Sequence, residues 1–143
     1  MNERIKKALT NLQCEFVAER NVVNPLEIKW IQYDILAALA KKKMLPSELS
    51  KYLGISRSKL SKNLFELRKS SYIEQIPSRT DHRELVTCIS DKGQKFLINI
   101  DAGHRKLTTI AINVLSQEEQ AEFIKIAEKL ADALGKERLT NGR

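Results

Sequence analysis

A short stretch near the middle of the chain carries side chains that can hydrogen-bond to a nucleic acid. The spacing of Leu60, Leu64 and Leu67 predicts a helix here, and Ser56 is suited to cap its N-terminus. Six polar residues crowd its first two turns: Arg57, Ser58, Lys59, Ser61, Lys62 and Asn63. Arg and Lys bind phosphates or guanine edges, Asn can pair with adenine, and Ser reaches either kind of group. Because Lys and Arg oppose the dipole at a helix N-terminus, a polyanionic partner explains them better than a solvated surface does.

A second polar cluster lies in a turn-prone segment between two short β-like runs. Arg79, His82 and Arg83 stand at the tip of this predicted hairpin, where a guanidinium can enter the negative minor groove of DNA. Asp81 in the same turn would be repelled by phosphate. We therefore expect Asp81 to hydrogen-bond the turn backbone or an arginine and to fix the shape of the hairpin. An ordinary polar loop is the alternative interpretation.

The positive charge of the chain is concentrated around these two clusters. Between Lys41 and Arg83 there are eleven Lys or Arg and four Asp or Glu, a balance of +7. The whole chain has 25 basic and 18 acidic residues, so the remainder sums to zero, 14 against 14. A basic block on a helical motif is typical of a protein that binds double-stranded DNA.

A second short helix is predicted just before the polar one. Pro46 suits its first turn, Leu49 and Leu53 form its apolar face, and Gly54 is expected to end it in a left-handed conformation. Two helices joined by such a turn make a helix-turn-helix, which places its second helix in the major groove. Ser47, in the first turn of the short helix, joins the residues expected to contact DNA.

The whole chain is predicted to be mainly α with a small β-wing. Apolar spacing and turn residues predict helices before Asn24, over 26–43, from Pro46 to Leu53, from Ser56 to about Ser71, from Ser90, and from Ser116 to Gly135, with strands over 72–76 and 85–89. Residues 26–90 form the expected winged helix-turn-helix domain. The helices of 1–25 and 91–135 have apolar faces too large for that domain to bury, so we expect a helical dimerisation layer rather than helices folded back on their own domain. Residues 136–143 are expected to be a loose tail.

Composition excludes several other classes of protein. The 42% apolar residues suffice for a packed core, and no apolar run approaches the roughly 18 residues that span a bilayer. The N-terminus lacks the apolar stretch of a signal peptide, and two distant cysteines do not make a secreted disulfide framework. We therefore expect a cytoplasmic protein that does not bind membranes.

The order of elements resembles that of the MarR family of winged helix-turn-helix transcription regulators. The most specific run is P-S-R-T-D-H-R-E-L-V-T-C-I-S-D-K-G, from Pro77 to Gly93, which is similar to the wing signature of the family. W-I-Q-Y-D-I-L-A-A-L (residues 30–39) resembles its second helix, with Gln32 in the usual place, and residues 45–58 match its helix-turn-helix. The resemblance implies a homodimeric repressor, Arg83 as the minor-groove arginine and Asp81 as its structural neighbour. It also implies a small-molecule effector, although the first helix and the segment that follows it are short for the family.

Cysteines and histidines offer few other sites. One branch of the resembled family has a sensing thiol in the first helix, so Cys14 is a redox candidate, but Glu15 and Glu19 would disfavour a thiolate, and a half-buried structural cysteine is the alternative. Cys88 is expected in the core. His82 and His104 have no ligand-spaced partners, so neither a metal nor a cofactor is expected.

Three functions are compatible with different parts of these observations. The first is a homodimeric, sequence-specific regulator of transcription, a repressor that a small molecule can release. The second is an enzyme, against which stand the lack of a glycine-rich phosphate loop, of a nucleophile–base pair and of paired histidines. The third is an architectural or RNA-binding protein with the same charge but no specific site. The partners expected for the first are double-stranded DNA, a second copy of the chain and an effector.

Overall fold

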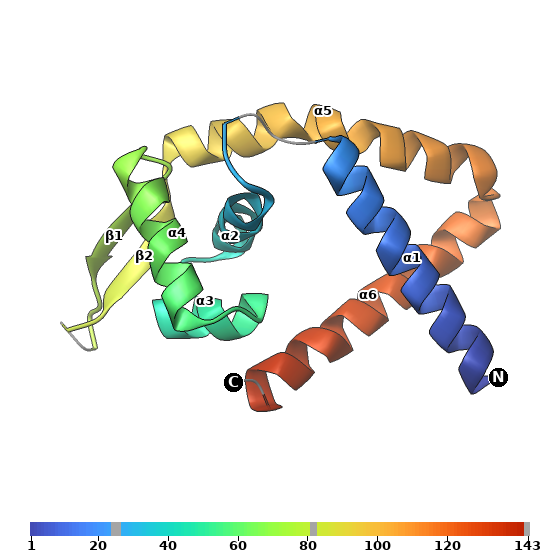
Figure 1. Cartoon of the computed structure of the whole chain (residues 1–143), viewed down its shortest axis with the longest axis horizontal. Helices are drawn as coiled ribbons and strands as arrows, with labels where there is room; N and C mark the ends of the chain where they lie inside the picture. Colours follow the sequence, from blue (N-terminus) through green and yellow to red (C-terminus); the bar gives the residue numbers. More distant parts are fainter. Residues whose placement is uncertain (24–26, 81–82, 142–143) are drawn as a thin grey trace. The chain divides into compact units, whose positions relative to one another are not determined.

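The computed structural model describes residues 1–23, 27–80 and 83–141, with the side chains of 101–103 and 141 excepted. Two candidate residues of the wing therefore lie outside the described residues: Asp81, expected to fix the shape of the hairpin, and His82, expected to enter the minor groove. The mainly helical prediction is confirmed. The elements are α1 (Asn2–Val22), α2 (Trp30–Lys41), α3 (Pro46–Leu53), α4 (Arg57–Lys69), β1 (Ile73–Pro77), β2 (Leu85–Ile89), α5 (Asp91–Val114) and α6 (Gln117–Asn141) (Figure 1). The chain divides into two compact units, Met1–Trp30 and Ile31–Arg143.

The first unit is α1 and the segment that follows it. The helix ends at Val22, as expected before an Asn-Pro pair, and the N–H of Val23 bonds the Glu19 carbonyl at 3.0 Å. Trp30 donates its indole N–H to the Arg20 carbonyl at 2.7 Å, and the Arg20 guanidinium lies 4.9 Å from the centre of the indole ring. These contacts fasten Val23 and Trp30 to the end of α1, where last-turn carbonyls have no partner within the helix. α1 itself, described over its whole length, buries none of its side chains.

In the second unit, local capping residues set the helix-turn-helix as the sequence predicts. Pro46 stands in the first turn of α3, and Glu48 accepts a hydrogen bond from the N–H of Leu45 at 3.1 Å. Gly54 ends the helix with φ 68° and ψ 34°, the left-handed conformation that glycine adopts without a steric penalty. The Ser56 hydroxyl then caps α4 by accepting from the N–H of Lys59 at 3.1 Å.

The core of the second unit lies where α2, α3, α4 and the start of β1 meet. Five of its side chains are less than 2% exposed and apolar: Ile35, Leu36, Leu49, Leu60 and Leu67. Each helix contributes the residues that recur every three or four positions along it, which is the apolar stripe that the sequence showed. This packing fixes the angle at which α4 presents its other side to solvent.

The wing is an antiparallel pair of strands, β1 and β2, joined by the loop that carries the arginines (Figure 1). Its register runs from Ile73 opposite Ile89 to Pro77 opposite Leu85. Met44, before α3, adds a bridge to Thr87 through two backbone hydrogen bonds of 3.1 and 2.8 Å. The wing is thus tied to the start of the helix-turn-helix.

A tight joint connects the end of α4, the start of β1 and the first turn of α5. Ser71 takes a left-handed φ of 66°, and the Ser90 hydroxyl donates to the Ser71 carbonyl at 2.6 Å. The same hydroxyl caps α5 by accepting from the N–H of Gly93 at 3.1 Å. A Cβ at Gly93 would lie 2.5 Å from the Tyr72 carbonyl oxygen, so a side chain there requires the joint to open. The joint thus links the first turn of α5 to the end of α4 and the start of β1.

Two sequence-based boundaries are wrong. The helix expected over 26–43 is shorter, because α2 runs from Trp30 to Lys41 and the described residues 27–29 and 42–43 lie outside it. Gly135 does not end the last helix, and the expected tail is helical as far as Asn141, where α6 ends. The glycine costs the helix about 1 kcal/mol relative to Ala, but contacts on either side of it offset that cost. Asp132 and Lys136 form an i,i+4 ion pair at 3.1 Å, and the Arg138 Nε–H donates to the Tyr52 carbonyl of α3 at 3.1 Å.

Large apolar side chains remain exposed on both long helices of the second unit. On α5 they are Ile98, Leu107, Ile110, Ile112 and Val114, and on α6 they are Phe123, Ile124, Ile126, Leu130, Leu134 and Leu139. The Ser116–Glu119 capping box between the two helices forms as predicted, with bonds of 2.9 and 3.1 Å. An exposed apolar surface of this extent is unusual for a chain that stays monomeric.

Candidate nucleic-acid interface

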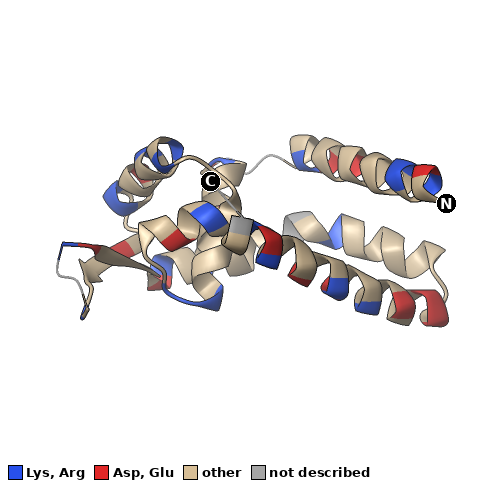
Figure 2. Ribbon diagram, turned by 90° about the horizontal axis from the view of Figure 1, so that it is seen from below, with Lys and Arg blue, Asp and Glu red and all other residues tan. Residues whose placement is uncertain are grey.

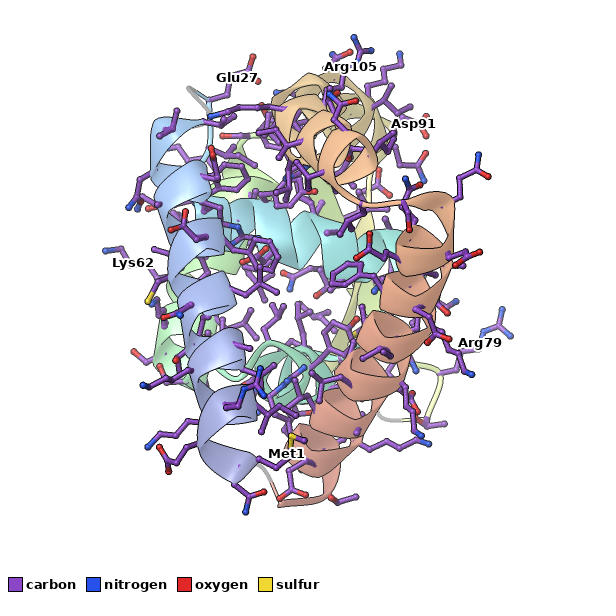
Figure 3. All side chains as sticks on the ribbon, turned by 90° about the vertical axis from the view of Figure 1, so that its right-hand side faces the viewer. Met1, Glu27, Lys62, Arg79, Asp91 and Arg105 are labelled. Carbon is purple, nitrogen blue, oxygen red and sulfur yellow. The ribbon has the colours of Figure 1, made fainter. Side chains whose placement is uncertain are left out.

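The outward side of α4 is a continuous strip of exposed residues. Successive residues of a helix are about 100° apart, so Ser58, Lys62, Phe65 and Lys69 point within about 30° of the direction away from the core. All four are exposed, and the Lys62 side chain extends away from the ribbon (Figure 3). Leu60, Leu64 and Leu67 on the opposite side are buried. The helix therefore has one face fixed in the core and one face free to enter a groove.

Cations line both flanks of this outward strip. Lys59 lies on one flank, and Arg57, Ser61 and Arg68 lie on the other, all of them exposed. In all, α4 has five basic residues and one acidic residue, whereas acidic and basic positions follow one another along α6, six against four (Figure 2). Cations on both sides of a helix can contact the phosphates of both walls of a groove. Positive charge is thus placed where a duplex would lie.

Asn63 is the exception among the predicted contact residues of α4. Its side chain is 4% exposed, its Nδ2 donates to the Lys59 carbonyl at 2.8 Å, and its Oδ1 accepts from Gln32 Nε2 at 3.2 Å. The expectation that Asn63 lies on the polar side of the helix is wrong, because Asn63 falls three residues after Leu60 and four before Leu67, within the apolar arc. Its amide is engaged inside the protein and does not face a base.

Gln32 of α2, 5% exposed, completes a buried polar cluster. Besides Asn63, its Nε2 donates to the Glu66 carboxylate at 2.6 Å, so one amide group joins α2 to two positions of α4 that are three residues apart. Buried polar groups are hydrogen-bonded because an unmet one is costly. The cluster therefore fixes the rotation of α4 about its own axis and its position along that axis relative to α2. The sequence offered one signal for it, a glutamine within the apolar stripe formed by Ile28, Ile31 and Ile35.

The serines predicted to contact DNA stand at the N-termini of the two helices. Ser47 is half-buried in the first turn of α3, and Ser56 is exposed with its hydroxyl oxygen engaged as the cap of α4. The buried Ser50, not singled out from the sequence, donates to the Ile55 carbonyl at 2.6 Å and braces the turn between them. The structure thus places Ser47 at the start of α3 and Ser56 at the start of α4.

The loop of the wing carries both arginines, and hydrogen bonds close the base of this loop. The N–H of Ser78 donates to the Glu84 carbonyl at 2.9 Å, and the Ser78 hydroxyl lies 3.1 Å from that of Thr80. Arg79 and Arg83 are both exposed, and Arg79 extends away from the ribbon (Figure 3). Arg68 of α4 donates to the Gln75 side-chain oxygen of β1 at 3.3 Å, which couples the helix to the wing.

The other candidate residues stand apart from this surface. Cys14 is exposed on α1 rather than half-buried, and Cys88 is half-buried in β2. His104 of α5 contacts the ring of Tyr33, with the ring centres 5.4 Å apart. Within residues 1–23, 27–80 and 83–141, no group of three His, Cys, Asp or Glu is placed to hold a metal ion, and no helix is long and apolar enough to cross a membrane.

Comparison with known proteins agrees with this geometry. The sequence profile of the MarR family matches residues 26–84, which cover α2, the helix-turn-helix, β1 and the wing loop. No curated protein matches the chain by sequence.

Solved structures share the fold over nearly the whole chain. FabT of Streptococcus pneumoniae, in complex with DNA, is 23% identical with a TM-score of 0.70, covering 95% of this chain and 99% of that one. A mutant of E. coli MarR, complexed with operator DNA, is 18% identical with a TM-score of 0.68, covering 91% and 97%. PcaV of Streptomyces coelicolor, with its natural ligand, is 20% identical with a TM-score of 0.66, covering 89% and 91%. The profile match falls on the domain that carries the exposed cationic helix and the arginine-bearing wing, and in this domain the chain is similar to the MarR family.

Proposed function

We propose that this chain is a homodimeric repressor that binds a specific operator in double-stranded DNA. The observation that carries the proposal is the outward side of α4. Ser58, Lys62 and Lys69 are exposed there and are flanked by further cations, while the opposite face of the helix is packed in the core. A recognition helix needs this combination of a rigid mount and free donors to read base edges. Members of the family are not enzymes, in agreement with the sequence-based prediction.

Contacts with DNA are assigned to two groups of residues. The major groove is assigned to Ser58, Ser61 and Lys62. The phosphates are assigned to residues on the flanks of α4 and at the helix starts, namely Ser47, Ser56, Arg57 and Lys59. Arg79 and Arg83 of the wing, with Asp81 and His82 between them, are assigned to the neighbouring minor groove. Asn63 is left out of this set because its amide is buried.

The exposed apolar side chains of α1, α5 and α6 support a dimer. α1 exposes Ile5, Leu9, Leu12 and Phe16 at the spacing of one helical face, and α5 and α6 add the eleven large apolar residues named above. Isologous pairing of such surfaces removes them from water and sets two recognition helices for two half-sites. The domain division proposed from the sequence is kept, with α6 extended to Asn141.

Release by a small molecule and a cytoplasmic location complete the proposal. Support for an effector comes from PcaV, a protein of the same fold solved with its natural ligand. The redox alternative has the exposure of Cys14 as its support.

Competition binding tests the proposal. A labelled duplex from the DNA upstream of the coding sequence is titrated at fixed salt, with and without a hundredfold excess of random duplex. A specific regulator keeps the labelled DNA in the complex, and dimethyl sulfate or nuclease footprints show two half-sites related by a dyad. If random duplex displaces the probe as well as the unlabelled probe does, the chain is an architectural protein instead.

A further inference from the structure

The outward strip of α4 contains a large apolar side chain at its centre. Phe65 is 57% exposed and is the single large apolar residue exposed on α4, which is described over its whole length. It lies three residues after Lys62 and four before Lys69, on the same side of the helix. In the described part of residues 26–90, the other exposed large apolar residues are Ile76 and Leu85, both on the wing strands.

The surroundings of Phe65 identify the kind of partner that covers it. Lys62 and Lys69 stand one turn to either side, Ser58 and Ser61 lie on the preceding turns, and all four are exposed. A protein partner that buried the ring would have to bury these lysines with it, which costs desolvation of two like charges. A duplex neutralises the lysines with phosphate while offering the ring the floor of the major groove. Charge complementarity thus favours DNA over a protein surface.

In the major groove, one group of the four bases is apolar, the 5-methyl group of thymine. We propose that Phe65 is a specificity-determining residue of the α4 surface, reading a thymine methyl group in each half-site of the operator. The inference rests on the proposed DNA-binding function and adds to it the identity of one base. The ring is held to its position along the groove by the Gln32–Asn63–Glu66 cluster, which fixes α4 from its inner side.

The test removes the methyl group and the ring separately. An operator is first obtained from random duplex by selection with the wild-type protein. Its thymines are then replaced one symmetric pair at a time by deoxyuridine, which lacks only the 5-methyl group. At one pair, wild-type affinity should fall roughly fourfold per methyl group and about 15-fold for the two half-sites, which is the effect of removing a buried methylene-sized group from each. Affinity is measured by fluorescence anisotropy at one salt concentration.

Phe65→Ala should bind the thymine and the deoxyuridine operators equally at that pair. The charge of α4 is unchanged in this variant, so its affinity for random duplex and its salt dependence should equal those of the wild type. Gln94→Ala, at an exposed uncharged residue of α5 that is not assigned to DNA, is the control and should keep the full wild-type sensitivity to the methyl group. Phe65→Gln serves as a second variant with the same expected insensitivity, should Phe65→Ala lose helix content.

The outcomes separate this inference from the function on which it rests. If selection yields no preferred sequence, the proposed function itself is wrong. If an operator is found but the loss caused by deoxyuridine is the same in the wild type and in Phe65→Ala, Phe65 does not read a methyl group. If Phe65→Ala lowers the affinity for single-stranded DNA more than the affinity for duplex DNA, the ring stacks on an unpaired base, which also overturns the inference.

Discussion

Replacing the buried amide pair between α2 and α4 should reveal a coupled contribution to stability. In Gln32→Leu, the Asn63 oxygen, on a side chain only 4% exposed, loses its donor at 3.2 Å, and the Glu66 carboxylate loses its donor at 2.6 Å. An unmet buried acceptor costs about 1–3 kcal/mol. Glu66 is half-buried, so water can replace its lost donor, and Glu66 adds little to the expected loss of stability. The expected loss is about 2 kcal/mol, and Asn63→Leu should lose about 1–2 kcal/mol through the same bond.

The double variant distinguishes a network from two independent sites. When both partners become apolar and similar in volume, no buried amide is left unmet, so Gln32→Leu/Asn63→Leu should lose about 1–2 kcal/mol rather than the sum of the single losses. The coupling energy, which is the sum of the single losses minus the loss in the double variant, is then about 2 kcal/mol.

Urea unfolding followed by circular dichroism gives these energies, provided that the slope with denaturant is constant and all variants are compared at one protein concentration. Gln94→Leu, an exposed glutamine of α5, is the matched control and should stay within about 0.5 kcal/mol of the wild type. Losses in the double variant that equal the sum of the single losses would refute the argument that this cluster fixes α4.

Three further substitutions test the rest of the structure. Leu130→Glu on α6 should dissociate the proposed dimer, because an unpaired charge in an apolar interface costs several kcal/mol. If sedimentation shows that the wild type is already a monomer at micromolar concentration, the proposed dimer is wrong. Ser71→Gly should raise stability by about 0.5 kcal/mol by relieving a left-handed φ, whereas Ser70→Gly, at φ −91°, should lower it in the same thermal melts. Arg83→Ala should weaken operator binding about tenfold in a mobility shift, and an equal effect of Lys129→Ala would show that the wing contributes only general charge.

Features governed by nearby residues were predictable from the sequence. The left-handed turn at Gly54, the cap at Ser56 and the capping box at Ser116 each depend on contacts within four residues, and each forms as expected. The order of helices and strands followed from the same local signals and from apolar spacing.

Features governed by distant residues were not predictable in the same way. The spacing of Asn63 from Leu60 and Leu67 puts it on the buried side of α4, but the partner that satisfies its polar side chain there is Gln32, 31 residues away. Gly135 ends a helix by local preference, but Arg138 reaches Tyr52, 86 residues away, and α6 continues through the glycine. In both cases a tertiary contact outweighs a local preference of about 1 kcal/mol.

Methylation protection on the selected operator tests the central claim most directly. Dimethyl sulfate modifies guanine N7, which lies in the major groove, and adenine N3, which lies in the minor groove. If α4 reads the major groove and the wing enters the minor groove, wild-type protein should protect guanine N7 in two half-sites about one helical turn apart and adenine N3 in the regions flanking them. Lys62→Ala should reduce the guanine protection and leave the adenine protection in place. Protection of adenine N3 alone, or of no base at concentrations that saturate binding, would contradict the assignment of α4 as the recognition helix.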